Sequence, residues 1–116
     1  MNFIEKTLNS QTVYEGKIIK VLKDDVEVAD GHKSFREVVK HSGGVVVLAI
    51  KENKILFVKQ FRYPMKKVLL ELPAGKLEYG EDPFIAAQRE LQEETGYCAN
   101  KWTDLGYVYT SPGYSD

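Results

Sequence analysis

The sequence predicts a mixed α+β domain, in which a body made mainly of strands carries one helix. Two observations lead to this fold class. The first two thirds of the 116-residue chain are short runs rich in β-branched and apolar residues, separated by turn residues. One later segment has helix-capping residues at both of its ends. The length fits one compact domain with a modest core.

The N-terminal third reads as three strands. Thr12–Lys20 and Val21–Ala29 are rich in β-branched residues, and Ser34–His41 alternates between apolar and polar residues. Asp30 and Gly31 lie between the last two runs and favour a hairpin turn, because glycine tolerates positive φ. This hairpin stands apart from the body, and the sequence leaves open whether it packs on that body or on a second subunit.

The middle of the chain predicts three further strands. Gly43 and Gly44 indicate a bulge or a close backbone contact. Val45–Ile50 is apolar at every position, which predicts a strand buried on both faces. After a polar turn, Ile55–Gln60 and Val68–Leu72 are also read as strands.

The helix is expected to follow Asp82, which suits the N-cap. Pro83 fits its first turn, and Gly96 fits its C-terminal cap. Trp102–Thr110 then predicts another strand, and Ser111–Asp116 has turn chemistry. The helix residues expected to face the core are Ile85, Ala86, Ala87 and Leu91.

Composition excludes several classes of function. The formal net charge is −1, so no global basic field favours nucleic acid or an anionic membrane. The longest apolar run, Val45–Ile50, is too short to span a bilayer, and the N-terminus lacks the apolar stretch of a signal peptide. Cys98 is the only cysteine, which suits a reducing, cytoplasmic location.

Three carboxylates lie at neighbouring positions of the predicted helix. Glu90, Glu93 and Glu94 share i, i+3 and i+4 spacing, so they project toward one side and repel one another. The helix dipole also disfavours negative charge in the last turn. A hard divalent cation, with Mg²⁺ the usual choice beside phosphates, would remove both penalties. The alternative is a solvated acidic face, although no basic residue lies between Glu90 and Glu94 to balance it.

The surrounding pattern resembles the signature of the Nudix hydrolase family. Every fixed polar and glycine position of the signature is filled, and Tyr97 replaces the bulky aliphatic residue that usually closes it. The resemblance implies a Nudix-type α/β/α sandwich with a mixed β-sheet and an N-terminal β-hairpin, here lacking its C-terminal strands and helix. The matching residues are Gly75, Glu81, Arg89, Glu90, Leu91, Glu93, Glu94 and Gly96.

The resemblance also implies roles for these residues. Glu90 and Glu94 look like ligands of Mg²⁺, or of Mn²⁺ in its place, with Glu93 close beside them. The backbone carbonyl of Ala74 looks like another ligand, and Gly75 lets the backbone approach the metal. In a separate role, Arg89 is expected to pair with Glu81 and to hold it in place by a bidentate contact.

Flanking segments are similar to those of bacterial ADP-ribose pyrophosphatases. In that subfamily Arg62 would contact the phosphates of the substrate and Arg36 would help to form the nucleotide site; the alternative for each is a surface ion pair. Pro112 lies fifteen residues beyond Tyr97, a spacing associated with the same subfamily. The similar segments are Phe35–Val39, Val58–Pro64, Glu71–Gly75 and Ser111–Tyr114.

The activity implied is Mg²⁺-dependent hydrolysis of ADP-ribose to AMP and ribose 5-phosphate. A small-molecule nucleotide substrate and a homodimer are therefore expected, with no nucleic acid or membrane partner. Residues 1–41 are expected to form a β-rich, dimerising segment and residues 42–116 the catalytic core. The subfamily takes a catalytic glutamate from a loop after the Pro-Gly turn, so a truncated chain of low activity is expected here.

Three alternatives stay open at this point. The first is a Nudix hydrolase for another nucleoside diphosphate derivative, a triphosphate or a dinucleotide. The second is a module that binds ADP-ribose without cutting it, although such domains tend to lose the signature carboxylates that this chain keeps. The third is an acidic helix with a purely structural role.

Overall fold

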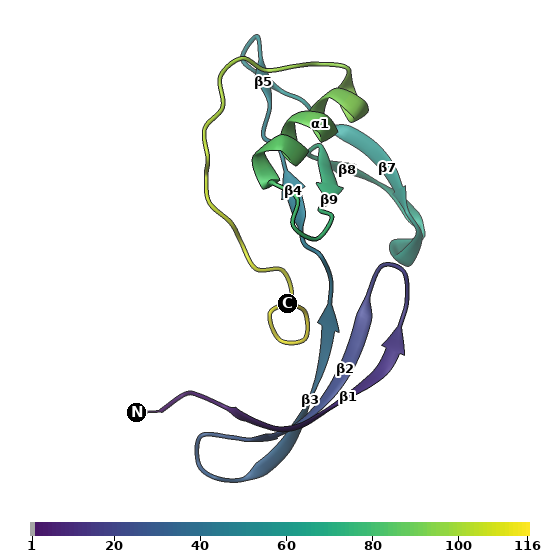
Figure 1. Cartoon of the computed structure of the whole chain (residues 1–116). Coiled ribbons are helices and arrows are strands. Elements are labelled where there is room, and N and C mark those ends of the chain that lie inside the picture. The colour runs from purple at the N-terminus through teal and green to yellow at the C-terminus, as the bar shows by residue number, and fades with distance from the viewer. Residues whose placement is uncertain (1) are drawn as a thin grey trace. The chain divides into compact units, whose positions relative to one another are not determined.

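The computed structural model describes residues 2–116, and their contacts divide into two units (Figure 1). One unit runs to His41 and also includes Leu105–Asp116. The other unit spans Ser42–Asp104 and holds the helix. Each unit has strands of its own.

The first unit is a three-stranded antiparallel sheet of order β1-β2-β3. Its strands are β1 (Lys6–Glu15), β2 (Lys20–Glu27) and β3 (Lys33–Lys40). The predicted turn at Asp30 and Gly31 is confirmed, with Gly31 at φ +92°. Val26 is the one buried hydrophobic side chain of this sheet among the described residues, and every residue of β1 is exposed.

The prediction of one strand over Thr12–Lys20 is wrong. β1 ends at Glu15, and Gly16 donates its backbone N–H to the Ile19 carbonyl at 2.9 Å, which closes a turn before β2. The β-branched pair Ile18 and Ile19 favoured a strand, but a glycine with its turn hydrogen bond decides the local structure.

The terminal residues form the predicted turn and lie along β3. Tyr114 and Ser115 donate their backbone N–H groups to the Ser111 carbonyl. The Val39 N–H donates to the Tyr114 carbonyl at 2.6 Å, and the Asp116 N–H donates back to the Val39 carbonyl at 3.0 Å. The end of the chain thereby satisfies part of the β3 edge.

The second unit pairs its strands two by two. β4 pairs with β9, β5 with β6 and β7 with β8, all antiparallel. A 3₁₀ turn, Tyr63–Met65, joins β7 to β8. The strands are β4 (Gly44–Val46), β5 (Ile50–Lys51), β6 (Lys54–Ile55), β7 (Val58–Arg62), β8 (Lys67–Glu71) and β9 (Ala74–Lys76).

Burial of Val45–Ile50 on both faces is a prediction that the structure contradicts. Val47 is buried, but Val46, Leu48 and Ile50 on the alternate face are 66%, 46% and 68% exposed. The segment is covered only on the side where α1 (Pro83–Thr95) packs against β4 and β9. Close backbone contact at the glycines is confirmed, since a Cβ on Gly44 would lie 3.1 Å from the Gly75 carbonyl oxygen.

The helix begins and ends where the sequence predicts. The Asp82 side chain accepts the backbone N–H groups of Phe84 and Ile85 at 2.8 and 3.3 Å, and Gly96 closes the helix at φ +75°. Ala86 and Leu91 are buried as expected. Ile85 is 62% exposed, so its predicted core position is wrong: a position next to a buried residue on a helix points about 100° away.

Trp102–Thr110 forms no strand, which corrects another prediction. Leu105, Tyr107 and Val108 are 79%, 81% and 84% exposed. Aromatic and β-branched residues favour extended backbone, but a strand exists only where a neighbouring strand takes up its hydrogen bonds. Among residues 2–116, no helix is long and apolar enough to cross a membrane.

Candidate metal centre

Two of the predicted carboxylates reach from α1 to the same short stretch of backbone. Glu94 Oε2 accepts the backbone N–H of Ala74 at 3.2 Å, and the Glu90 side chain lies against Gly75. Both positions share the helix face that packs toward β9. The Glu90 side chain is only 14% exposed, so the alternative of a solvated acidic face does not hold for it. Glu93 is 58% exposed and does face solvent.

Gly75 is needed because of Glu90, and not because of its own backbone angles. A Cβ on Gly75 would lie 2.5 Å from Glu90 Cγ and would overlap the carboxyl group itself. Its φ is not in the left-handed region, so any other residue fits the backbone but displaces the carboxylate. The glycine therefore keeps open the place that Glu90 takes up beside the Ala74–Gly75 backbone.

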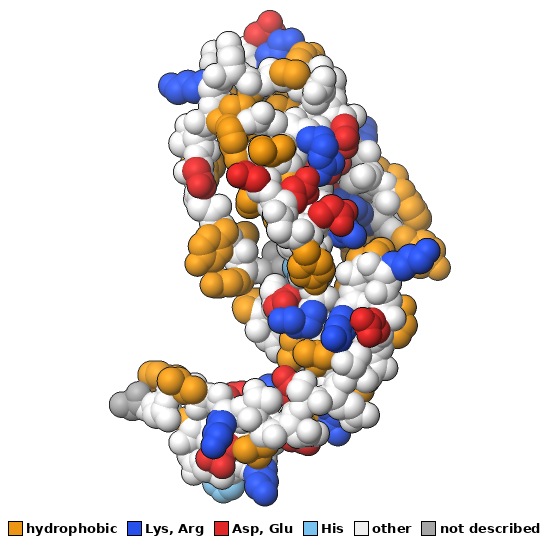
Figure 2. Space-filling model, viewed as in Figure 1, with side chains coloured by type: hydrophobic (Ala, Val, Ile, Leu, Met, Phe, Trp, Pro, Cys, Tyr) orange, Lys and Arg blue, Asp and Glu red, His pale blue; other side chains and the backbone are white. Residues whose placement is uncertain are grey.

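Arg89 is the positive partner of this cluster. The expected pairing with Glu81 is present, with Arg89 Nη2 at 3.1 and 3.4 Å from the two carboxylate oxygens. Arg89 Nη1 also donates to Glu90 at 3.0 Å and to Glu93 at 3.4 Å. No basic residue lies between Glu90 and Glu94, but Arg89, just before them, supplies a positive partner from the same helix. In Figure 2, acidic and basic side chains lie intermixed over the region of α1.

Glu81 is held in its ionised form by two donors. The backbone N–H of Glu78, at 3.1 Å, and then the Arg89 guanidinium hold the pKa of the Glu81 carboxyl below its usual value. Because the folded-state pKa is lowered, the stabilisation is present above the ordinary carboxyl pKa and is lost as the pH falls through the lowered one. The loop before α1 is therefore tied to the helix at neutral pH.

The donor set suits a hard divalent cation. The Glu90 and Glu94 side chains offer oxygen ligands, as the Ala74 carbonyl would, and oxygen is what Mg²⁺ prefers. Among residues 2–116, no three acidic, histidine or cysteine side chains gather closely enough to hold an ion by themselves. Two carboxylates therefore need the backbone carbonyl, and phosphate or water oxygens, to complete a coordination shell.

Arg62 is close enough to Glu94 to feel its charge, and it has a partner that sequence reasoning missed. Its Nε and Nη2 donate to the two Glu71 oxygens at 2.7 and 2.8 Å. Hydrogen bonding to Glu71 first, and then the charges of Glu71 and Glu94, raise the pKa of the Arg62 guanidinium. The pair could have been predicted from the sequence, because alternate side chains of a strand share a face. This alternation places Arg62 and Glu71 on one face of the β7–β8 hairpin.

Arg36, the other predicted substrate residue, belongs to β3 in the first unit. It donates to Glu5 from Nε at 2.9 Å and from Nη2, and to the Phe35 carbonyl at 2.8 Å. The alternative of a surface ion pair therefore describes Arg36 as the structure has it. Its proposed place in a nucleotide site stays a prediction.

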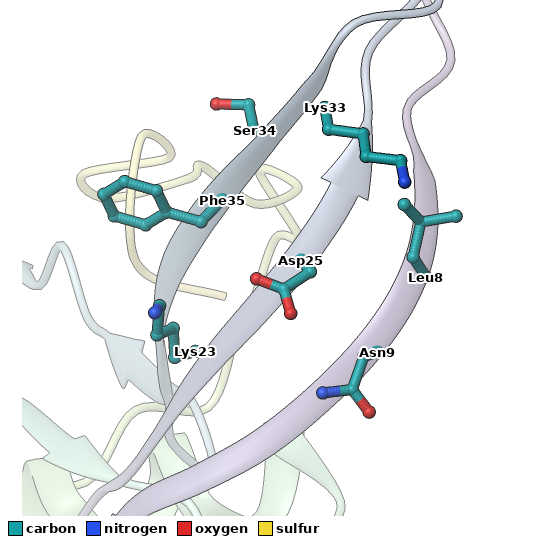
Figure 3. A pocket seen from close by; sticks show the side chains of 7 residues that line it. All are labelled: Leu8, Asn9, Lys23, Asp25, Lys33, Ser34 and Phe35. Atoms are coloured by element: carbon teal, nitrogen blue, oxygen red, sulfur yellow. The ribbon is translucent and has the colours of Figure 1, made fainter.

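A hollow of about 440 Å³ lies on the three-stranded sheet (Figure 3). Lys23 Nζ lies 5.5 Å from the centroid of the Phe35 ring, and Asp25 comes from the same strand as Lys23. Its mixed charges select for neither an anion nor a cation, so we assign it no function. The residues that line it are Leu8, Asn9, Lys23, Asp25, Lys33, Ser34 and Phe35.

Comparison with known proteins gives two family matches and several relatives. The NUDIX domain matches residues 40–116, and the nucleoside diphosphate sugar hydrolase N-terminal domain matches residues 5–39. The chain is 51% identical to an ADP-ribose pyrophosphatase of Bacillus subtilis, with 97% of this chain and 61% of that protein covered. It is 49% identical to a methanol dehydrogenase activator of Bacillus methanolicus, with 98% of this chain and 62% of that protein covered.

A solved structure described as an ADP compounds hydrolase has the same fold. The TM-score is 0.83 at 25% identity, over 96% of this chain and 61% of that one. The chain thus spans about three fifths of the length of the relatives first matched. The predicted fold class is confirmed by this likeness, and the signature residues occupy the loop and helix that meet at Ala74 and Gly75. The chain belongs to the Nudix family.

Proposed function

We propose that this protein hydrolyses the diphosphate bond of ADP-ribose, giving AMP and ribose 5-phosphate, with Mg²⁺ or Mn²⁺ as cofactor. One observation carries the proposal: Glu94 accepts the backbone N–H of Ala74 and the Glu90 side chain lies against Gly75, so both carboxylates reach the same short stretch of backbone. Gly75 makes room for the Glu90 carboxylate, and an acidic helix with a purely structural role would not require this.

Each residue at the site has a distinct task in this proposal. Glu90, Glu94 and the Ala74 carbonyl would hold the cation, which would supply positive charge beside the diphosphate and the attacking water. Glu93, the most exposed of the three carboxylates, accepts hydrogen bonds from water at the edge of the site.

Arg62, outside the helix, supplies a contact with the phosphates of the substrate. The Arg62 guanidinium is 40% exposed, so part of it is open to a phosphate oxygen. Arg36 offers a flat face for the nucleotide base. The ion pair of Arg89 with Glu81 holds the loop against the helix, and neither residue contacts the substrate in this proposal.

The choice of ADP-ribose is supported by the relatives. Those from Bacillus subtilis and Mycobacterium tuberculosis, at 51% and 41% identity, are named ADP-ribose pyrophosphatases. The matched structure is described more broadly, as an ADP compounds hydrolase. The nearest alternative is therefore another nucleoside diphosphate derivative cut by the same chemistry.

A second candidate is a module that binds ADP-ribose without cutting it. One observation favours it: Arg89 neutralises Glu90 and Glu93, and no group of three acidic side chains gathers among residues 2–116. In this case ADP-ribose would bind without release of AMP. The retained carboxylates favour hydrolysis over binding alone.

The test is a titration of Mg²⁺, and separately of Mn²⁺, into the chain, followed by chromatography of ADP-ribose incubated with it. We expect a rise in the thermal unfolding midpoint that saturates with the cation, and AMP among the products. Binding of ADP-ribose without AMP would select the second candidate. No cation response and no nucleotide binding would contradict both. A panel with ADP-glucose and a dinucleoside diphosphate ranks the substrates.

We also propose that the protein is a cytoplasmic homodimer, with residues 1–41 as its dimerising part and residues 42–116 as its catalytic core. The first unit supports this, because all of β1 is exposed and the sheet has a single buried hydrophobic side chain, Val26, among those described. A small sheet with so little core gains stability when a second copy covers it. Light scattering that gives a monomer mass at high protein concentration would contradict the dimer.

A further inference from the structure

We propose that Glu71 is a positioning residue that keeps the Arg62 guanidinium away from Glu94, and so keeps the carboxylates on α1 available to a cation. The inference rests on the proposed function, because it assumes that these carboxylates bind metal. It concerns the pair on β7 and β8, which lies outside the signature itself.

The register of the β7–β8 hairpin explains why Arg62 turns toward Glu71. Arg62 pairs directly with Lys67, and Glu71 pairs with Val58 at the other end of the ladder. Two positive side chains directly opposite each other on one face repel. The Arg62 side chain therefore runs along the hairpin, away from Lys67, to reach a carboxylate four positions farther along β8.

The contact occupies one edge of the guanidinium and leaves the other open. Nε and Nη2 donate to the two Glu71 oxygens at 2.7 and 2.8 Å, which fixes the plane of the group. Among residues 2–116, no hydrogen bond of Nη1 is found. An arginine fixed in this way presents its Nη1 side to an incoming oxygen without further loss of side-chain freedom.

Glu94 is a second carboxylate in this neighbourhood, because it accepts the backbone N–H of Ala74, only three residues after Glu71. The charge of Glu94 already acts on Arg62 and contributes to its raised pKa. Glu71 is 25% exposed in its side chain and engages both of its oxygens, so it holds Arg62 more firmly than an exposed single contact would. A released Arg62 would pair with Glu94 and compete with the cation for it.

A double-mutant cycle on Mg²⁺ affinity tests the inference without any activity assay. The full chain is prepared as wild type, Glu71→Ala, Arg62→Ala and the double variant, and Mg²⁺ is titrated calorimetrically. We expect Glu71→Ala to weaken Mg²⁺ binding by about three- to fivefold, as one new exposed ion pair would. We expect Arg62→Ala to change it little in the wild type, but to restore it in the Glu71→Ala background.

The cycle separates competition from a plain change of charge. If Glu71 acted only through its negative charge, Arg62→Ala would have the same effect in both backgrounds, because distant charges contribute additively. Additive effects, or a wild-type affinity in Glu71→Ala, would overturn the inference while the proposed function stood. No Mg²⁺ binding by the wild type would overturn both.

Two further variants serve as controls for a loss of folding and for a general effect of charge. Glu71→Gln keeps the shape and one strong acceptor, so a weakening of about twofold is expected from it. Glu52→Gln removes one negative charge from the exposed turn between β5 and β6 and should leave Mg²⁺ affinity unchanged. Far-ultraviolet circular dichroism confirms that each variant is folded before titration. A Glu71→Gln effect as large as that of Glu71→Ala would contradict the positioning role.

Discussion

Replacing Glu94 by glutamine is expected to abolish stabilisation by Mg²⁺ and to lower ADP-ribose cleavage by about 100-fold or more. Glutamine has nearly the same shape and still offers an oxygen to the Ala74 N–H, 3.2 Å away in the wild type. Only the negative charge is removed. The loss of cation binding would therefore follow from the chemistry of the ligand, and not from a change in the packing of α1.

Thermal unfolding with and without cation measures this effect. At a Mg²⁺ concentration 100 times its Kd, the wild type gains about 2.7 kcal/mol, which corresponds to a shift on the order of 10 °C for a chain of this size. Glu94→Gln should show no such shift. Glu52→Gln, with the same change of charge at an exposed turn, should behave as the wild type. A full cation shift in Glu94→Gln would mean that Glu94 is not a ligand.

Replacing Leu91 by alanine is expected to lower the free energy of unfolding by about 2–5 kcal/mol. The Leu91 side chain is 1% exposed and comes from the helix that packs on β4 and β9. Few hydrophobic side chains are buried in the described residues, so there is little other core to compensate: the set is Val26, Val47, Pro73, Ala86 and Leu91. A loss of this size is a large fraction of the stability of a small domain.

Urea unfolding followed by circular dichroism gives the measurement. Ile85→Ala is the matched control, because it lies on the same helix and is 62% exposed. It should cost less than about 1 kcal/mol. Equal losses in the two variants would show that the helix does not pack through Leu91. The metal response of folded Leu91→Ala should persist, since Leu91 carries none of the proposed ligands.

Local residue types were enough to predict the elements with strong local signals. Asp82 and Gly96 end the helix through contacts within a few residues, and Gly31 allows its turn through its own backbone. The spacing of Glu90 and Glu94 on one helix face also follows from the helical period alone. These features depend on neighbours in sequence, so the sequence reveals them.

The predictions that were wrong depend on distant neighbours. Val45–Ile50 is apolar throughout, but burial depends on what covers each face, and only one face is covered here. Tyr107 and Val108 have strand-forming side chains, yet among residues 2–116 no strand pairs with them to complete a ladder. The residues of a segment do not specify which element packs over it or which strand pairs with it.

The features of the candidate metal centre also fall into two groups, those that follow from the sequence and those that depend on tertiary packing. The sequence by itself determined the helical spacing of the carboxylates, and the resemblance to the Nudix signature predicted the ion pair of Arg89 with Glu81, because these residues lie within one loop and its helix. Only the tertiary structure decided that Glu94 meets the Ala74 backbone and that Arg62 is held by Glu71. The physical reason is that a hydrogen bond of about 3 Å depends on how strands and helix pack, and residue types do not specify that packing.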